Sequence, residues 1–418
     1  MKLSRIGRVS MAFVVSVAMG LGMTACGGGT IGYLWVMGTQ YNQIAGFKID
    51  DFTGNLTAIP TSPFSSGGTN PVSIVVKPGG RYVYVINKGT PATSTTPATA
   101  GQIAAFSVGN EGVLTFQLSY TSQGTTPVWA SVDSTGSFLY VLDQQAPPVD
   151  PTQPTILPPY GSITVFAIDP NTGRLQLVPN QQVKNSQGTQ LTYFPVGSQP
   201  TMMKVAANNC LYTLNSGDNT IFPYSIGTGG QLTLTTNSTI TTGATRLTSV
   251  NANGSYVYLT DAGAANTPGQ ILPYTTGTGC ALNTLTGGPV PNLTGASNPV
   301  NTMVDSKGRY LYVVNNSTTN SQATATSNVS AFAIDSTSGK LQPLPIGDTN
   351  NPYPVGAGPL CMVQDPTNQY VYTSNNIDGT VTGKIINQNT GQLSDLQRGS
   401  KFPATGQATC LAVSGVVN

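Results

Sequence analysis

The chain offers few side chains that could perform acid–base or nucleophilic chemistry. It contains no histidine, and Glu111 is its only glutamate. Catalytic pairs and zinc sites that need an imidazole are therefore excluded. Hydrolysis of any substrate would have to depend on the remaining carboxylates and on Lys, Arg or Tyr.

Four charged residues interrupt an otherwise repetitive pattern. Asp143 and Asp261 stand where four other copies of a repeated segment have Asn. Arg246 lies at or beside a position that Pro occupies in most copies, and Lys204 is a lone charge within an expected strand. A carboxylate could activate water, and a cation could stabilise the oxyanion of a hydrolysed lactone. We predict that these four residues, with Trp129, are the candidate catalytic or ligand-binding residues.

Each candidate also has a purely structural interpretation. Asx side chains at strand ends often close the next turn by binding backbone groups, which would explain Asp143 and Asp261. Arg246 and Asp261 are expected on paired strands, where they could form a local salt bridge. Lys204 could extend its ammonium group into a wet channel without binding a ligand, and Trp129 could fill a gap between neighbouring elements.

A repeated segment defines the elements that must position these residues. It recurs from Trp35 to Tyr372 with a mean period of about 56 residues, which is typical of a repeat array. One expected strand precedes each copy and two follow it, so each unit is predicted to be a four-stranded antiparallel meander. The seven copies are YLWVMG at 33–38, YVYVIN at 82–87, FLYVLD at 138–143, CLYTLN at 210–215, YVYLTD at 256–261, YLYVVN at 310–315 and YVYTSN at 370–375.

Seven such units, rich in β-branched and aromatic residues, predict an all-β protein that forms a seven-bladed β-propeller. The first unit begins at Tyr33 and lacks its innermost strand, whereas residues 408–415 resemble an innermost strand with no blade after it. The two ends of the chain are therefore expected to share one blade and close the ring. The predicted propeller domain covers residues 33–418.

The connections at the two rims of the predicted ring differ in length. Short turns rich in Gly, Asn, Asp and Ser share one rim. Long connections share the other, and such segments commonly carry binding surfaces. Their Pro, Thr, Ser and Gln content favours neutral or sugar-like ligands, although inert solvated loops are the alternative. The long connections are 88–100, 144–160, 183–199, 285–298, 316–327 and 344–358.

Residues 1–25 have the pattern of an export signal. Lys2, Arg5 and Arg8 precede an apolar run that is too short to span a bilayer. The sequence MTAC that follows resembles the bacterial lipobox, so we predict lipidation of Cys26, a tether over 26–32 and attachment to a membrane. The glycine after it favours the outer membrane, by resemblance to other lipoproteins. An ordinary secretory signal with an unmodified cysteine is the alternative.

Four further cysteines suggest two disulfides in an oxidising compartment. Cys361 and Cys410 occupy matching positions in the innermost strands of adjacent blades. Cys210 and Cys280 fall at short turns of adjacent blades. We predict the pairings 210–280 and 361–410, with free buried thiols as the alternative.

The charge balance argues against nucleic acid as a partner. Without the export signal the chain has 14 basic and 15 acidic side chains, so it presents no positive footprint. No glycine-rich phosphate loop, paired-cysteine metal site or calcium loop is visible. We therefore expect no cofactor or metal, and a monomer whose partners are a membrane and a small-molecule or carbohydrate-like ligand.

The YVYVIN and YVYTSN segments, together with GQIAAFSV at 101–108 and GSITVFAI at 161–168, resemble YVTN-type propeller repeats. From about Tyr33 to Ser414 the chain resembles the seven-bladed lactonase family, which includes bacterial 6-phosphogluconolactonases. The resemblance implies lactone hydrolysis by His, Glu and Arg at the mouth of the channel. Since histidine is absent and Glu111 falls in a lower turn, those roles do not transfer to this chain.

Two functions are consistent with the sequence. In the first, an exported, membrane-anchored propeller binds a neutral or weakly anionic ligand, polymer or partner on its long-loop face without turnover. In the second, the protein is a lactone hydrolase that uses Asp, Arg and Lys in place of His and Glu. The set of available residues favours the first function, and the family resemblance favours the second.

Overall fold

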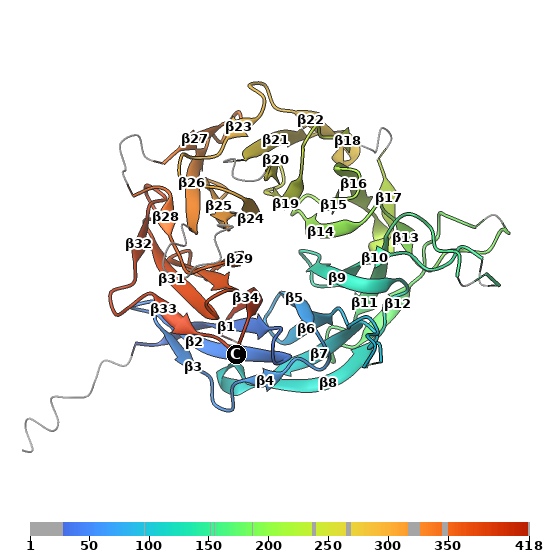
Figure 1. Cartoon of the computed structure of the whole chain (residues 1–418), viewed down its shortest axis with the longest axis horizontal. Coiled ribbons are helices and arrows are strands. Elements are labelled where there is room, and N and C mark those ends of the chain that lie inside the picture. The colour runs from blue at the N-terminus through green and yellow to red at the C-terminus, as the bar shows by residue number, and fades with distance from the viewer. Residues whose placement is uncertain are drawn as a thin grey trace, which may run out of the picture.

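The computed structural model describes residues 28–416 except 96, 151, 154, 186, 236–239, 265–268, 317–326 and 345–349. The predicted signal segment 1–25 and Cys26 lie outside the described residues. Figure 1 shows seven β-sheets arranged as blades around a common axis, which confirms the predicted all-β propeller. Within the described ranges no helix is long and apolar enough to cross a membrane. The helical turns there are η1 (Asn110–Gly112), η2 (Thr228–Gly230) and η3 (Thr278–Cys280).

Each blade is an antiparallel meander whose innermost strand faces the axis. In six blades the first four strands follow one another outward in chain order, and in the closing blade β34 is followed outward by β1, β2 and β3. The innermost strands are β5 (Pro71–Val76), β9 (Thr125–Val132), β14 (Pro200–Val205), β19 (Leu247–Ala252), β24 (Pro299–Val304), β29 (Pro359–Gln364) and β34 (Ala408–Gly415). The second strands, which carry the repeated segment, are β1 (Thr30–Gly38), β6 (Tyr82–Asn87), β10 (Phe138–Gln145), β15 (Cys210–Asn215), β20 (Tyr256–Asp261), β25 (Tyr310–Asn315) and β30 (Tyr370–Asn375).

In six of the seven blades the outer half contains one strand more than the sequence predicts. The third strands are β2 (Gln43–Asp50), β7 (Gln102–Val108), β11 (Ser162–Ile168), β16 (Thr220–Ile226), β21 (Gln270–Thr276), β26 (Asn328–Ile334) and β31 (Thr380–Ile386). The fourth are β3 (Leu56–Ala58), β8 (Leu114–Tyr120), β12 (Leu175–Val178), β17 (Leu232–Leu234), β22 (Leu282–Thr284), β27 (Leu341–Pro343) and β32 (Leu393–Asp395). Six blades add a short fifth strand: β4 (Phe64–Ser65), β13 (Phe194–Pro195), β18 (Ile240–Thr241), β23 (Val290–Pro291), β28 (Tyr353–Pro354) and β33 (Lys401–Pro403).

The fifth strands have a simple physical cause. In the blade of β9–β13, the fourth strand pairs with the third only over 165–168, and the fifth pairs over 162–163. The short fourth strand leaves backbone donors and acceptors of the third strand unpaired, and the returning connection satisfies some of them. Parts of the long connections are therefore fixed to the blades and are not free loops.

The ring is closed as the sequence predicts. Strand β34 pairs antiparallel with β1, with Trp35 opposite Ala412 and Tyr33 opposite Ser414. The Cys361–Cys410 disulfide joins β34 to β29 of the adjacent blade, and its Cα atoms are 5.2 Å apart. Both predicted pairings are confirmed, since Cys210 also bonds to Cys280. The closing strand is thus held by hydrogen bonds on one side and by a covalent bond on the other.

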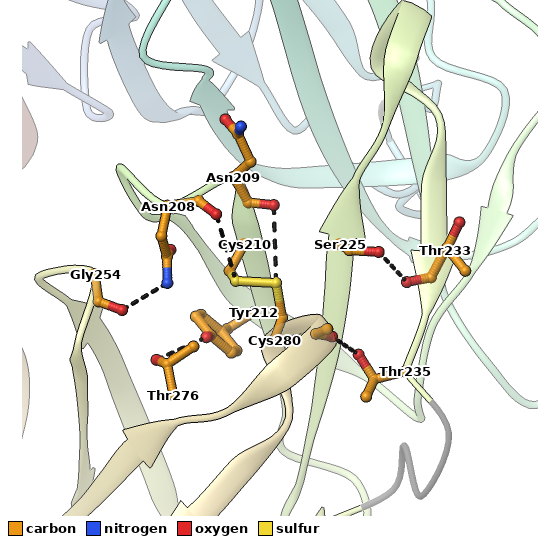
Figure 2. Close-up of a disulfide and its surroundings, with 11 residues drawn as sticks. Asn208, Asn209, Cys210, Tyr212, Ser225, Thr233, Thr235, Gly254, Thr276 and Cys280 are labelled. Atoms are coloured by element: carbon orange, nitrogen blue, oxygen red, sulfur yellow. Dashed lines mark hydrogen bonds between the residues drawn. A yellow bond between two sulfur atoms is a disulfide. The ribbon is translucent and has the colours of Figure 1, made fainter.

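In several blades the central aromatic of the repeated segment donates a hydrogen bond to the next blade, whereas the hydroxyl of Tyr140 has no partner among the described residues. The hydroxyl groups of Tyr84, Tyr258 and Tyr312 donate hydrogen bonds of 2.8–2.9 Å to glycine carbonyls in a turn of the neighbouring blade. Tyr212 instead contacts the Thr276 hydroxyl at 3.1 Å. Figure 2 shows this junction, where the disulfide from Cys210 reaches the turn before β22. The repeat therefore encodes contacts between blades as well as the blades themselves.

Candidate functional site

Two connected cavities lie along the axis of the ring. The lower chamber, of about 520 Å³, lies between the innermost strands of all seven blades. The upper chamber, of about 260 Å³, lies near the starts of these strands. Because the strands begin at the rim that carries the long connections, the upper chamber is the one nearer to that rim. The two chambers share Trp129, Met202, Asn301, Cys361 and Cys410.

Of the four charged candidates, only Lys204 lines this channel. It is half-buried in β14, two residues after Met202. None of the ion pairs found between described residues involves Lys204. Burial lowers the pKa of its amine below the ordinary lysine value, because the charged form loses solvation. A cation in this environment can bind a carboxylate or polarise a carbonyl group.

Asp143 ends up behind the channel wall. Its side chain is fully buried, and it accepts a hydrogen bond of 2.6 Å from Ser122 Oγ and one of 3.5 Å from Thr164 Oγ1. Burial raises the pKa of Asp143 to about 7, although hydrogen bonds from Ser122, Gly124 and Thr164 act in the opposite direction. The side chain attaches the connection before β9 to the end of β10. Asp143 is not among the residues that line the two chambers, because this position points into that connection.

Asp261 is also buried away from the channel, with 2% of its surface exposed. It accepts hydrogen bonds from the backbone N–H groups of Thr245, Arg246 and Gly263 at 2.8–3.1 Å. Gln270 Nε2 donates a fourth at 3.0 Å. Burial alone would raise the pKa of Asp261, but the backbone donors outweigh it and hold the pKa below its ordinary value. The carboxylate is thus an acceptor that organises the connection before β19.

Arg246 is exposed at the rim and points to the next blade. Its guanidinium donates a hydrogen bond of 2.8 Å to Asn298 Oδ1. Only its backbone N–H contacts Asp261, so the local salt bridge considered from the sequence is not formed. The position matching the prolines of the other innermost strands is in fact Leu247, which pairs with Asp261 as Pro299 pairs with Asn315.

Trp129 lies in the wall of both chambers. It is half-buried in β9 and also packs against core residues of three neighbouring clusters. The structure therefore brings Trp129 and Lys204 to one cavity and leaves Asp143, Asp261 and Arg246 outside it.

Gln364 is a channel residue that the sequence analysis missed. Its Oε1 accepts a hydrogen bond of 2.8 Å from the backbone N–H of Ser306. Its Nε2 is buried and has no acceptor among the described residues. The signal was present, since Gln364 is the last residue of PLCMVQ, where Val76, Val205 and Val304 end the matching strands.

Other polar groups of the channel wall are already used within it. Asn251 Nδ2 donates to the Thr302 carbonyl at 2.7 Å, and Ser131 Oγ donates to the Met203 carbonyl at 3.3 Å. Among the described residues there is also no group of three or more potential metal ligands. Lys204 is thus the cationic side chain that the described channel wall offers to a bound molecule.

A sequence profile described as "Lactonase, 7-bladed beta-propeller" matches residues 30–153. No curated protein sequence matches the chain. The profile confirms the resemblance to the seven-bladed lactonase family over that part of the chain.

Solved structures extend the likeness in fold around the whole ring. A periplasmic gluconolactonase of Pseudomonas aeruginosa is 16% identical, with a TM-score of 0.67 over 93% of this chain and 100% of that one. A Bacteroides uniformis protein whose assignment as a 6-phosphogluconolactonase is provisional is 14% identical, with a TM-score of 0.67 over 92% and 100%. A Lactobacillus plantarum protein is 18% identical, with a TM-score of 0.65 over 92% and 100%.

Proposed function

We propose that this lactonase-like propeller binds a small lactone, or the hydroxy acid formed from it, in its central channel. The observation that carries the proposal is Lys204, a half-buried cation that has no ion-pair partner among the described residues and lies in a cavity walled by all seven blades. The binding site thereby moves from the long-loop face, where the sequence analysis expected it, into the channel below that face.

The chemistry of the lower chamber suits a carbonyl or carboxylate group. Lys204 supplies a positive charge from β14 in the wall of this chamber. The attraction of a carboxylate to a half-buried ammonium is stronger than the same attraction in water. Phosphate is less suited, since the channel lacks the multiple donors that phosphate sites present.

We also propose that the protein is exported and anchored to a membrane through Cys26. The Cys210–Cys280 and Cys361–Cys410 disulfides support export, because such bonds persist in oxidising compartments. The periplasmic location in the name of the Pseudomonas aeruginosa relative points the same way. Mass spectrometry of the mature N-terminus tests the anchor: a lipid-modified Cys26 is expected, and an unmodified N-terminus would contradict it.

Binding can be measured by titration calorimetry of the mature protein with hydroxy acids, which avoid the complication of turnover. We expect Lys204→Met to weaken binding at least tenfold. Lys340→Met, which removes an exposed lysine away from the channel, is the matched control and should leave affinity unchanged. Equal affinities for the wild type and Lys204→Met would contradict the proposed site.

Lactone hydrolysis is a second candidate function, supported by the lactonase profile and by the gluconolactonase among the structural relatives. Asp143 and Asp261 do not face the channel, so the base would be the neutral amine of Lys204. The amine would take a proton from water as that water attacks the lactone carbonyl. As the bond from the carbonyl carbon to the ring oxygen breaks, the resulting ammonium would return the proton to that oxygen, which becomes the hydroxyl of the hydroxy acid.

Acid release from lactones, followed by pH-stat titration, separates the two functions. Turnover that is lost in Lys204→Met but kept in Asp143→Asn and Asp261→Asn would establish hydrolysis in the channel. Turnover lost in either Asp variant, with the fold intact, would show that the chemistry depends on the carboxylates. Binding without turnover would leave the first function alone.

A further inference from the structure

The upper chamber is lined mainly by apolar side chains. Val72, Val300 and Leu360, the second residues of three innermost strands, contribute to its wall. Trp129 and Met202 extend the apolar surface toward the axis. No charged residue of the described chain is among its lining residues. A ligand that enters from the long-connection rim therefore meets an apolar surface first.

The polar groups of this chamber are occupied by the protein itself. The hydroxyl of Thr409 donates a hydrogen bond of 3.2 Å to the carbonyl oxygen of Pro71. The amide nitrogen of Asn301 lies 4.0 Å from the sulfur of Cys361. Hydroxyl groups of a sugar ring would lose water in this chamber and find few partners, which is unfavourable. An alkyl or aryl group would instead gain from burial.

The apolar and cationic parts of the channel are adjacent. Met202 lines both chambers and precedes Lys204 by two residues on β14, so the two side chains share one face of the strand. Two residues along a strand correspond to roughly 6.6 Å. A molecule of modest length can thus place one end against Met202 and Trp129 and its other end at Lys204.

On this basis we infer that the channel ligand is amphiphilic: an aliphatic lactone, or its hydroxy acid, with an apolar chain. The chain occupies the upper chamber, and the carbonyl or carboxylate lies at Lys204. The inference rests on the proposed binding in the channel and adds the class of ligand. At roughly 30 Å³ for each small group, the upper chamber accommodates about eight carbon atoms. Sugar lactones, which carry hydroxyls in place of the chain, fit this channel poorly.

Calorimetry with two hydroxy acids tests the inference: 5-hydroxydecanoate, which has an apolar chain, and gluconate, which has hydroxyls instead. We expect 5-hydroxydecanoate to bind at least tenfold more tightly. Trp129→Ser and Met202→Gln should each remove most of that preference, while Lys204→Met should weaken both acids. Phe52→Ser, at a residue that is 81% exposed, is the matched aromatic control. Thermal unfolding verifies that each variant is folded, and the two upper-chamber variants are independent of each other.

The outcomes separate the inference from the proposed function. Gluconate binding more tightly than 5-hydroxydecanoate, still dependent on Lys204, would overturn the amphiphilic ligand but keep the channel site. Binding of 5-hydroxydecanoate that is unaffected by Trp129→Ser and Met202→Gln would also overturn the inference. If neither acid binds the wild type, the channel site itself fails and the inference fails with it.

Discussion

Asp143 and Asp261 occupy the same position in two blades yet have opposite electrostatic environments. Each ends the repeated segment and pairs with a residue near the start of an innermost strand, Pro127 in one blade and Leu247 in the other. Burial raises the pKa of Asp143 to about 7, whereas backbone donors hold the pKa of Asp261 below its ordinary value despite its burial. The comparison teaches that the connection folded over the carboxylate decides its ionisation.

The same position in other blades shows what the side chain does when it carries an amide. Asn87 Nδ2 donates to the carbonyl of Ser66 at 3.0 Å, and Asn375 Nδ2 donates to the hydroxyls of Thr380 and Thr382. Asn87 thereby attaches a rim connection to the end of the second strand, whereas Asn375 attaches that end to the third strand of its own blade. The two aspartates keep this structural role with a carboxylate, which supports the capping interpretation of the sequence.

The largest expected effect comes from removing the better-bonded carboxylate. Asp261→Ala leaves the backbone N–H groups of Thr245, Arg246 and Gly263 without their acceptor, so the free energy of unfolding should fall by about 3 kcal/mol. Asp143→Ala should cost about 1 kcal/mol, since it mainly leaves hydroxyl groups that can rotate. Urea unfolding at pH 7 measures both losses. Equal losses would show that the two sites do not differ as described.

Asparagine substitutions at the two sites should change the free energy of unfolding in opposite directions. Asp143→Asn removes a carboxylate whose ionised form is disfavoured by burial, so it should raise the free energy of unfolding by roughly 2 kcal/mol at pH 8. Asp261→Asn replaces an acceptor oxygen by an amide that faces N–H groups, so it should lower the free energy of unfolding by about 1–2 kcal/mol. The measurement is denaturant unfolding at pH 8, and stabilisation by both substitutions would contradict the comparison.

The pH dependence sharpens the contrast further. Because the pKa of Asp143 is raised to about 7, the native state holds a proton that the unfolded chain loses near pH 4. Its contribution to stability is complete below about pH 4 and is lost as the pH rises through 7. Subtracting the wild-type stability from that of Asp143→Asn should give a curve that rises between about pH 4 and pH 7. For Asp261→Asn the difference should change only below about pH 4, because the pKa of Asp261 is lowered.

The smallest effect is expected at Arg246. Its exposed guanidinium donates a hydrogen bond to Asn298. Its backbone N–H can donate to Asp261 in any variant except proline. Arg246→Ala should change the free energy of unfolding by less than about 0.5 kcal/mol. In the Arg246→Ala background, the stability difference between Asp261→Asn and the protein that retains Asp261 should depend on pH as it does in the wild type. A profile that shifted toward neutral pH would show that the arginine charge, and not its backbone, stabilises the carboxylate.

The fold was predictable because its determinants are local and repeated. The segment around Tyr84 recurs in each blade, and its buried aromatic and flanking apolar residues specify a strand whatever the rest of the chain does. Both disulfides were predictable for the same reason: once the repeats are aligned, Cys361 and Cys410 occupy matching positions on adjacent strands. The fifth strands were missed because their short segments, such as 194–195, carry no periodic pattern.

The candidate site was only partly predictable. Lys204 and Trp129 lie on innermost strands, whose place around the axis follows from the repeat. Asp143 and Asp261 also follow from the repeat in backbone position, but the direction and partners of their side chains depend on connections of irregular sequence. Gln364 was overlooked because a single glutamine among valines is informative only when the neighbouring strands are seen to enclose a cavity.

The amino-acid sequence alone determined the number of blades, the shared closing blade and the pairing of four cysteines, since regular repetition turns local preferences into a global arrangement. Only the tertiary structure decided which charged group faces the channel and which is enclosed by backbone donors. The reason is that burial and hydrogen bonding at one position depend on how the irregular connections fold over it, as Thr245 and Arg246 fold over Asp261.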